Sequence, residues 1–295
     1  MDDYVLRIIA QESGFRAVLL LTTQITREAC RRHKTTAAAT PVLADGMTAA
    51  AMLGSLLKMK QRVALRFEGN GPMKLMITES TSHGLLRGYT THPEAEAENP
   101  ADILGPKGLF KVVKDVGLKD LIESVVDRKG SVAEDIAHYL ETSEQTRSLV
   151  AIATEPIEES GMIAISGGLL VQALPGADPA IIDKLEDRLQ ELPPFGKLLQ
   201  QMWDKDSDVP LEQIADLLFE GTDSKTLEKR WLFFHCNCSR ERSESALVSL
   251  GVAELKSLIK THKEVVTDCH FCNEQYVFTN KDIRNLIKQI ESRKG

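Results

Sequence analysis

Four cysteines near the C-terminus constrain this chain more than any other feature of its sequence. They form a Cys-x-Cys pair, Cys236 and Cys238, and a Cys-x-x-Cys pair, Cys269 and Cys272, with thirty residues between the pairs. Four sulfur ligands in two close pairs fit tetrahedral Zn²⁺ better than other metals. In a reduced chain this pattern indicates metal binding or redox chemistry rather than a disulfide scaffold. The sequence therefore predicts a zinc site.

Such a site either only stabilises the fold or also acts as a redox switch. Most zinc sites with four cysteines are structural, and their closed coordination leaves no position for a catalytic water. Two properties favour a switch. A Cys-x-Cys disulfide closes a very small ring, so it is strained and easily reduced. A zinc-bound cysteine is already a thiolate, the form that oxidants attack. Spacing alone does not decide between the two interpretations.

The length of 295 residues is typical of two domains, and an apolar content of 42% is enough for a sizeable core. No apolar run approaches the roughly 20 residues of a membrane span. No signal-peptide pattern is present. Because four of the five cysteines are clustered, we expect a reduced, cytoplasmic protein without a membrane partner.

The net charge of −7 is unevenly distributed along the chain. Residues 225–295 contain 13 Lys and Arg against 9 Asp and Glu, whereas the preceding residues are acidic. A basic C-terminal segment keeps a nucleic-acid-binding function open. However, Zn²⁺ with four thiolates carries a charge of about −2, so the folded segment would be only weakly basic. We therefore interpret these basic residues as an ordinary solvent-exposed surface and keep nucleic acid as an alternative partner.

Residues 1–177 are predicted to form a mixed α/β domain. Apolar alternation on both sides of Gly69-Asn70-Gly71-Pro72 is a hairpin signature, and Ser131 with Glu134 forms a capping box. The expected strands cover residues 4–9, 15–22, 62–68, 73–79, 85–90, 149–154 and 162–173, and the expected helices include 26–34 and 49–58. The histidines are scattered, and no phosphate loop or nucleophile elbow is present, so we expect no enzyme. Cys30 is interpreted as a small packed residue.

Residues 178–230 are predicted to form a helical linker. Pro179 and Pro210 start helices, and Gly221 ends the last one. Flexible linkers are usually poor in apolar residues. This segment instead has apolar helix faces that we expect to be buried: Ile181, Ile182, Leu185, Leu189, Ile214, Leu217 and Leu218. It must therefore lie folded against another part of the chain. An ordinary helical layer and a linker that undocks fit the pattern equally well.

Residues 231–295 are predicted to form a zinc-binding domain of strands and helices around the cysteines. At this size the domain buries little apolar surface, and structural zinc contributes on the order of 10 kcal/mol in small zinc modules. Removal of the metal should therefore unfold it. His235 and His270 adjoin the cysteines, but four sulfurs already complete a tetrahedron. We therefore interpret both histidines as neighbours of the metal site that do not bind the metal.

Three motifs together resemble the heat shock protein 33 family of redox-regulated, ATP-independent holdase chaperones of the bacterial cytosol. They are the cysteine pattern, Ser143-Glu144-Gln145, and the run Gly167-Gly168-Leu169-Leu170-Val171-Gln172-Ala173-Leu174-Pro175-Gly176. The resemblance implies an α+β fold: a mixed α/β N-terminal domain, a helical linker and a small C-terminal zinc-binding domain. The order of these parts matches over essentially the whole chain.

The resemblance also implies a switching cycle. Cys236, Cys238, Cys269 and Cys272 would bind one Zn²⁺ when reduced. Oxidation would form Cys236–Cys238 and Cys269–Cys272 disulfides and release the metal. The linker would then unfold, homodimers would form, and unfolding client proteins would be protected from aggregation under oxidative stress. Cys30 lies outside the motif and receives no role.

Two other classes of function remain as alternatives. A zinc-dependent nucleic-acid-binding regulator would use the basic C-terminal segment, and its affinity would depend steeply on salt. An enzyme would need an acid, a base or a nucleophile assembled in one site, and the sequence assembles none.

Overall fold

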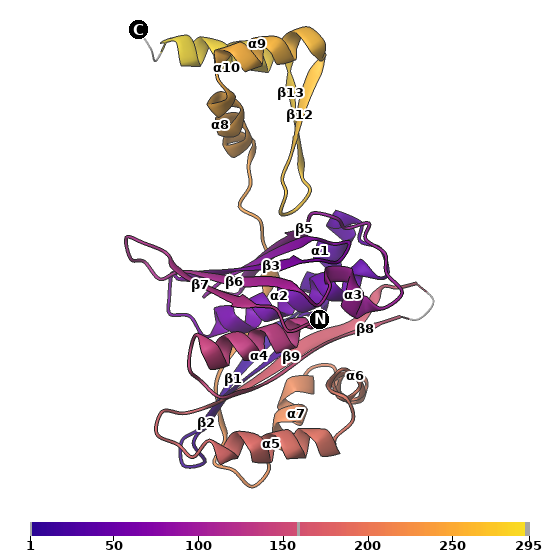
Figure 1. The fold of residues 1–295 in the computed structure, drawn as a ribbon, viewed down its shortest axis with the longest axis vertical. Helices are drawn as coiled ribbons and strands as arrows, with labels where there is room; N and C mark the ends of the chain where they lie inside the picture. The colour runs from indigo at the N-terminus through magenta and orange to yellow at the C-terminus, as the bar shows by residue number, and fades with distance from the viewer. Residues whose placement is uncertain (1, 158–159, 293–295) are drawn as a thin grey trace. The chain divides into compact units, whose positions relative to one another are not determined.

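The computed structural model describes residues 2–157 and 160–292 (Figure 1). The chain forms two compact units, Met1–His235 and Cys236–Gly295. Among the described residues, no helix has both the length and the apolar character that a bilayer crossing requires.

The first unit contains a five-stranded sheet in which all neighbours are antiparallel. In spatial order its strands are β10 (Lys225–Trp231), β1 (Tyr4–Ala10), β2 (Phe15–Leu21), β9 (Ile163–Ala173) and β8 (Ser148–Pro156). The two strands expected over residues 4–9 and 15–22 are therefore confirmed, and they pair with each other. The two chain segments that flank β1 in the sheet come from opposite ends of this unit.

The second sheet of this unit has six strands. In spatial order they are β11 (Phe233–Phe234), β5 (Leu85–Thr90), β4 (Leu75–Thr81), β3 (Arg62–Gly69), β6 (Gly108–Asp115) and β7 (Ile122–Asp127). The predicted hairpin is confirmed, because β3 and β4 pair antiparallel on either side of the glycine-rich turn. Strand β11 differs from the others in pairing parallel to its neighbour, β5.

Helix α2 (Ala39–Ser55) lies between the two sheets (Figure 1) and has 14 buried residues. It begins ten residues before the helix expected from residue 49. The surrounding core draws on both sheets and includes Phe67 and Phe110, whose ring centroids are 4.4 Å apart. The other helices of this part are α1 (Thr23–His33), α3 (Pro100–Leu104) and α4 (Val132–Thr142). Helix α4 begins with the predicted capping box of Ser131 and Glu134.

The opposite face of the five-stranded sheet is covered by α5 (Ala180–Glu191), α6 (Phe195–Lys205) and α7 (Pro210–Leu218) (Figure 1). These linker helices share a second hydrophobic core with the sheet. Two glycines of β9 permit close packing on both faces of the strand. A Cβ at Gly167 would lie 2.6 Å from Leu199 Cδ2 on α6, and one at Gly168 would lie 3.0 Å from Thr48 Cγ2 on α2.

The predicted burial of the linker is confirmed, with one exception. Ile182, Leu185, Ile214 and Leu218 are buried, and Ile181 and Leu189 pack against the same core from partly buried positions. Leu217 is 43% exposed, so its predicted burial is wrong. It follows directly after Asp216 and lies on the outward side of the last turn of α7.

The end of the linker is not helical as predicted. Residues 225–230 belong to β10, which ends at Trp231 and pairs antiparallel with β1. After Leu232, Phe233 and Phe234 form β11 in the other sheet. The helical prediction failed because the segment has no helical apolar face, and its strand conformation depends on the free edge of β1. The first compact unit consequently extends to His235.

The second unit contains α8 (Arg240–Leu250), α9 (Val252–Thr261), β12 (Glu264–Asp268), β13 (Gln275–Thr279) and α10 (Asn280–Ser292). The strands and helices predicted around the cysteines are confirmed, and β12 pairs antiparallel with β13. Its core is small and has six buried apolar side chains: Leu247, Leu255, Phe278, Ile283, Leu286 and Ile287. A unit with so little buried apolar surface needs additional stabilisation.

Candidate metal centre

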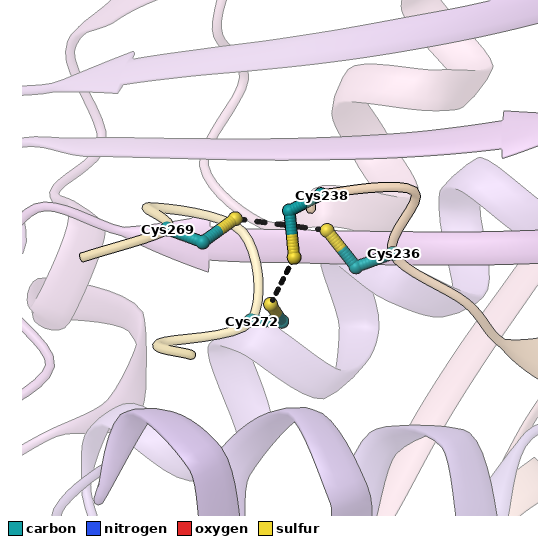
Figure 2. A group of neighbouring side chains, drawn as sticks. All are labelled: Cys236, Cys238, Cys269 and Cys272. Atoms are coloured by element: carbon teal, nitrogen blue, oxygen red, sulfur yellow. Dashed lines mark hydrogen bonds between the residues drawn. The ribbon is translucent and has the colours of Figure 1, made fainter. Parts of the chain in front are cut away.

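The four predicted cysteines come together in the second unit. Their Sγ atoms all lie within 4.8 Å of one another (Figure 2). The Sγ atoms of Cys236 and Cys269 are 3.6 Å apart, and those of Cys238 and Cys272 are 3.3 Å apart. A tetrahedral ion with Zn–S bonds of about 2.3 Å separates its sulfurs by about 3.8 Å. The cluster therefore has the size of a four-thiolate metal site.

Two short irregular segments position these side chains. Cys236 and Cys238 lie just before α8, whose first turn is capped by Ser239 through a 3.3 Å hydrogen bond from the Arg242 amide. Because the cap fixes the point where the helix begins, it also limits the conformations of the Cys-x-Cys segment before it.

Cys269 and Cys272 lie in the turn between β12 and β13. The Asn273 amide donates to the Cys269 carbonyl at 2.7 Å, and the Cys269 amide donates to the Glu274 carbonyl at 2.9 Å. Asn273 has a φ of 58°, a left-handed conformation that Asn tolerates better than most residues. This turn directs both cysteines toward the Cys-x-Cys segment (Figure 2).

Arg240 joins the two halves of the site. Its guanidinium donates to the Val277 carbonyl at 2.8 Å, lies 3.2 Å from an Asp282 carboxylate oxygen, and lies 4.3 Å from the centroid of the Phe278 ring. The first residue of α8 is thereby fixed to β13 and to α10. Since the two cysteine pairs adjoin these elements, Arg240 helps to bring them together.

The electrostatics of the cluster match a cation-binding site. Burial raises the pKa of the Cys272 thiol above its usual value, and burial also raises the pKa of Cys269. Adjacent buried thiols lose their protons only when a nearby positive charge offsets the cost. A divalent cation supplies that charge. The donor set, four sulfurs without carboxylates, fits Zn²⁺ better than Mg²⁺ or Ca²⁺.

Tyr276 contacts the cluster and was not anticipated from the sequence. Its hydroxyl donates a 3.2 Å hydrogen bond to Cys238 Sγ, and this bond raises the pKa of the Tyr276 phenol. In the sequence, the only indication of this contact is that Tyr276 follows Cys272 by four residues. In the structure Tyr276 lies on β13, which pairs with β12. The hydroxyl stabilises negative charge on the sulfur.

The other candidate residues lie outside the cluster. Among the described residues, the group that can hold a metal ion consists of the four cysteines alone, without His235 or His270. Cys30 belongs to the first unit, is buried, and donates from Sγ to the Thr40 carbonyl at 3.7 Å. Burial raises its pKa to about 11, so Cys30 is protonated and unreactive at neutral pH. Its interpretation as a packed residue agrees with this environment.

Comparison with known proteins extends this description to the whole chain. A family model described as "Hsp33 protein" matches residues 3–279. Two relatives named 33 kDa chaperonin, from Geobacter sp. (strain M21) and Citrifermentans bemidjiense, are each 41% identical. The first alignment covers 98% of both chains, and the second covers 100% of both.

A solved structure gives the same result for the fold. The crystal structure of the 33 kDa chaperonin (heat shock protein 33 homolog) from Thermotoga maritima matches with a TM-score of 0.88 at 27% identity, over 99% of each chain. The α+β architecture and the resemblance found in the sequence are both confirmed. The chain carries a C-terminal four-cysteine cluster able to hold a metal ion, and it belongs to the Hsp33 family of 33 kDa chaperonins.

Proposed function

We propose that this protein is an ATP-independent holdase whose activity is controlled by zinc and thiol oxidation. In the reduced state Cys236, Cys238, Cys269 and Cys272 bind one Zn²⁺, and the chaperone is inactive. The proposal rests on four sulfur atoms that all lie within 4.8 Å of one another, in a unit with only a small core of six buried apolar side chains. Zinc is then the principal source of stability for that unit.

Oxidation removes the metal by consuming its ligands. A thiolate attacks one oxygen of a hydroperoxide and the O–O bond breaks. The other oxygen leaves as hydroxide or alkoxide and takes up a proton, and the sulfur becomes a sulfenic acid. The second thiolate of the pair then displaces hydroxide, which leaves as water, and a disulfide forms. Two hydroperoxides accept the four electrons of two disulfides. Once both pairs are disulfides, the four sulfurs would no longer hold Zn²⁺.

We propose the pairs Cys236–Cys238 and Cys269–Cys272 for these disulfides. In the folded cluster the shortest sulfur separations run between the two motifs instead, with sequence separations of 33 and 34 residues. Oxidation of the first sulfur removes one ligand and opens the site, and the nearest remaining thiolate along the chain then lies two or three residues away. Closing that short loop costs less entropy than closing a loop of 33 or 34 residues, so the pairing within each motif is favoured.

Loss of the second unit then affects the linker. We propose the functional division into a chaperone domain (1–177), a linker (178–230) and a redox-switch domain (231–295). The linker ends in β10 and β11, which lead directly into Cys236. Undocking of α5, α6 and α7 would expose their apolar faces and the face of the five-stranded sheet beneath them. Apolar surface binds unfolding proteins with up to roughly 25 cal/mol per Å² buried.

The remaining parts of the proposal concern partners and location. Clients are unfolding proteins, capture requires no nucleotide, and release follows reduction. The oxidised form is a homodimer, because newly exposed apolar surface also favours self-association. The protein acts in the bacterial cytoplasm, where thiols are normally reduced and an oxidant is an informative signal.

Aggregation of thermally unfolding luciferase tests the proposal. We expect the peroxide-oxidised protein to suppress light scattering and the zinc-bound reduced protein not to, with zinc release preceding activity. Cys30→Ser is the matched control and should respond to oxidation like the unchanged protein. Equal protection of luciferase in both redox states would show that the zinc site is only a structural staple.

A further inference from the structure

The segment between the linker helices and Cys236 supplies one edge strand to each of the two sheets of the first unit. Strand β10 is the edge strand beside β1, and β11 is the edge strand beside β5. Only four residues, 232–235, separate β10 from Cys236. These edge strands are therefore the part of the first unit nearest in sequence to the metal centre.

Strand β10 is held in place without burying a side chain. None of its seven residues is buried, whereas five of the seven residues of β1 are buried. Its side chains instead make ion pairs, Arg7 with Glu228 and Lys229 with Glu212, both at 2.9 Å. Exposed or half-exposed pairs contribute little stability. Between residues 225 and 235 the only buried side chain is Leu232, which is 4% exposed and belongs to the core between the sheets.

Removal of β10 would leave unpaired backbone groups on β1. The Leu232 amide donates to the Asp3 carbonyl at 2.9 Å. Because hydrogen-bonded pairs alternate along an antiparallel ladder, Val5 and Arg7 are the next β1 residues whose amides face β10. An exposed edge of this kind is a template for another strand.

The sheet face beside this edge determines which strand fits. Tyr4, Leu6 and Ile8 project from β1 into the core that the linker helices cover. When those helices undock, this apolar face continues to the edge of β1. A strand added there would place every second side chain beside the face, since side chains alternate along a strand. The best occupant is an extended segment with apolar residues at alternate positions.

We propose that β10 leaves with the unfolding second unit and that the vacated edge of β1 binds extended segments of unfolding client proteins by strand addition. The inference rests on the proposed function and specifies one mode of client binding. Main-chain hydrogen bonds supply affinity that is independent of client sequence, and the apolar face selects the alternating pattern. Both properties suit a protein that holds many different clients.

A pair of synthetic peptides tests this mode with the full-length protein. The probe has the sequence of residues 225–232, and the control is the same peptide N-methylated at residues 228, 230 and 232, which face β1. We expect the probe to bind the oxidised, zinc-free protein and to displace unfolding luciferase. The control should bind at least tenfold more weakly. Equal binding of the two peptides, or no competition with luciferase, would overturn the inference.

Hydrogen exchange detected by NMR provides a second measurement that needs no substitution. The Val5 and Arg7 amides should lose protection on oxidation and regain it when luciferase is bound. If oxidation activates the protein but these amides keep their protection throughout, strand addition is wrong while the proposed function stands. If oxidation produces no chaperone activity, the proposed function itself fails.

Discussion

The Tyr4 hydroxyl donates a 2.6 Å hydrogen bond to Glu212 Oε2, across 208 positions of sequence. Tyr4 is a fully buried residue of β1, and Glu212 lies in the first turn of α7. The same hydroxyl accepts a 3.3 Å bond from the Leu211 amide. Lys229 of β10 lies 2.9 Å from Glu212 Oε1 and 4.1 Å from the Tyr4 ring centroid. The Glu212 carboxylate thus connects the five-stranded sheet, through Tyr4, to α7 and to the edge strand β10, through Lys229.

Tyr4→Phe should weaken the docking of α7 without creating a cavity. A hydrogen bond to a charged group contributes about 1.5–3 kcal/mol, and its loss leaves the Leu211 amide unpaired. We expect faster hydrogen exchange in α7 and activation at a lower peroxide concentration. Tyr139→Phe is the matched control, because its hydroxyl also donates to a carboxylate, that of Glu144, but contacts no linker helix. A variant whose α7 exchanges at the unchanged rate would contradict this role of Tyr4.

Local signals in the sequence identified the elements that depend on few neighbours. The β3–β4 hairpin follows from its glycine-rich turn, and helix α4 follows from the Ser131 and Glu134 capping box. The cysteine cluster was also predictable, because two close pairs of thiols have few other uses in a reduced chain.

Long-range packing decided the features that the sequence left undetermined. Strand β10 has little apolar pattern of its own, and its conformation is fixed by pairing with β1 more than 200 residues away. The start of α2 was missed because a helix buried between two sheets has no polar face to give a helical period. Tyr276 was missed because only the folded hairpin brings its hydroxyl to Cys238.

Replacement of any one cluster cysteine should abolish stable zinc binding. Each of the four sulfurs supplies one position of a closed tetrahedron, so a serine in place of any of them leaves a weaker, open site. We expect one zinc per chain in the anaerobically purified reduced protein and much less than one in each variant, measured by metal analysis. Cys30→Ser should keep a full equivalent of zinc. X-ray absorption should detect only sulfur ligands, and nitrogen in the coordination shell would contradict the assignment.

Chelation of zinc should unfold the second unit selectively. Its six buried apolar side chains stabilise it weakly, whereas the first unit has two large cores. Hydrogen exchange of reduced protein treated with a chelator should therefore rise to the unfolded rate over residues 240–292. Protection in β3 and β4 should persist. Unchanged protection across the second unit after verified zinc loss would show that the metal does not stabilise the fold.

A buried carboxyl group makes the first unit less stable as pH rises. Asp3 is 2% exposed and accepts hydrogen bonds from the Gln24 and Ile25 amides. Burial raises its pKa to about 7 from an ordinary 3.8. Between these values the folded chain keeps a proton that the unfolded chain has lost, so the free energy of unfolding decreases with increasing pH. The decrease is essentially complete about one pH unit above this pKa, near pH 8, and amounts to at most about 4 kcal/mol.

Asp3→Asn should remove the part of this pH dependence that Asp3 contributes, because the amide does not titrate. Burial also raises the pKa of Asp45 to about 7, and that contribution should remain in both proteins. Urea unfolding of the reduced protein is measured at pH 5 and pH 8 through Trp203 and Trp231, which both lie in the first unit. We expect the variant to gain stability relative to the unchanged protein between pH 5 and pH 8. Asp2→Asn, at an exposed position, is the control. A parallel pH profile for Asp3→Asn and the unchanged protein would contradict this role.

Tyr276→Phe should make the zinc site respond faster to oxidant while leaving it intact. The hydroxyl donates to Cys238 Sγ but supplies no metal ligand, so zinc content should remain at one per chain. A hydrogen bond lowers the electron density on a thiolate and thereby slows its attack on peroxide. Loss of about 1 kcal/mol of this stabilisation corresponds to roughly a fivefold faster reaction. Zinc release under limiting peroxide, followed with a metal-binding dye, measures the rate. Tyr89→Phe, in the six-stranded sheet of the first unit, should release zinc at the unchanged rate. Equal rates for the Tyr276 and Tyr89 variants would mean that the hydroxyl does not tune Cys238.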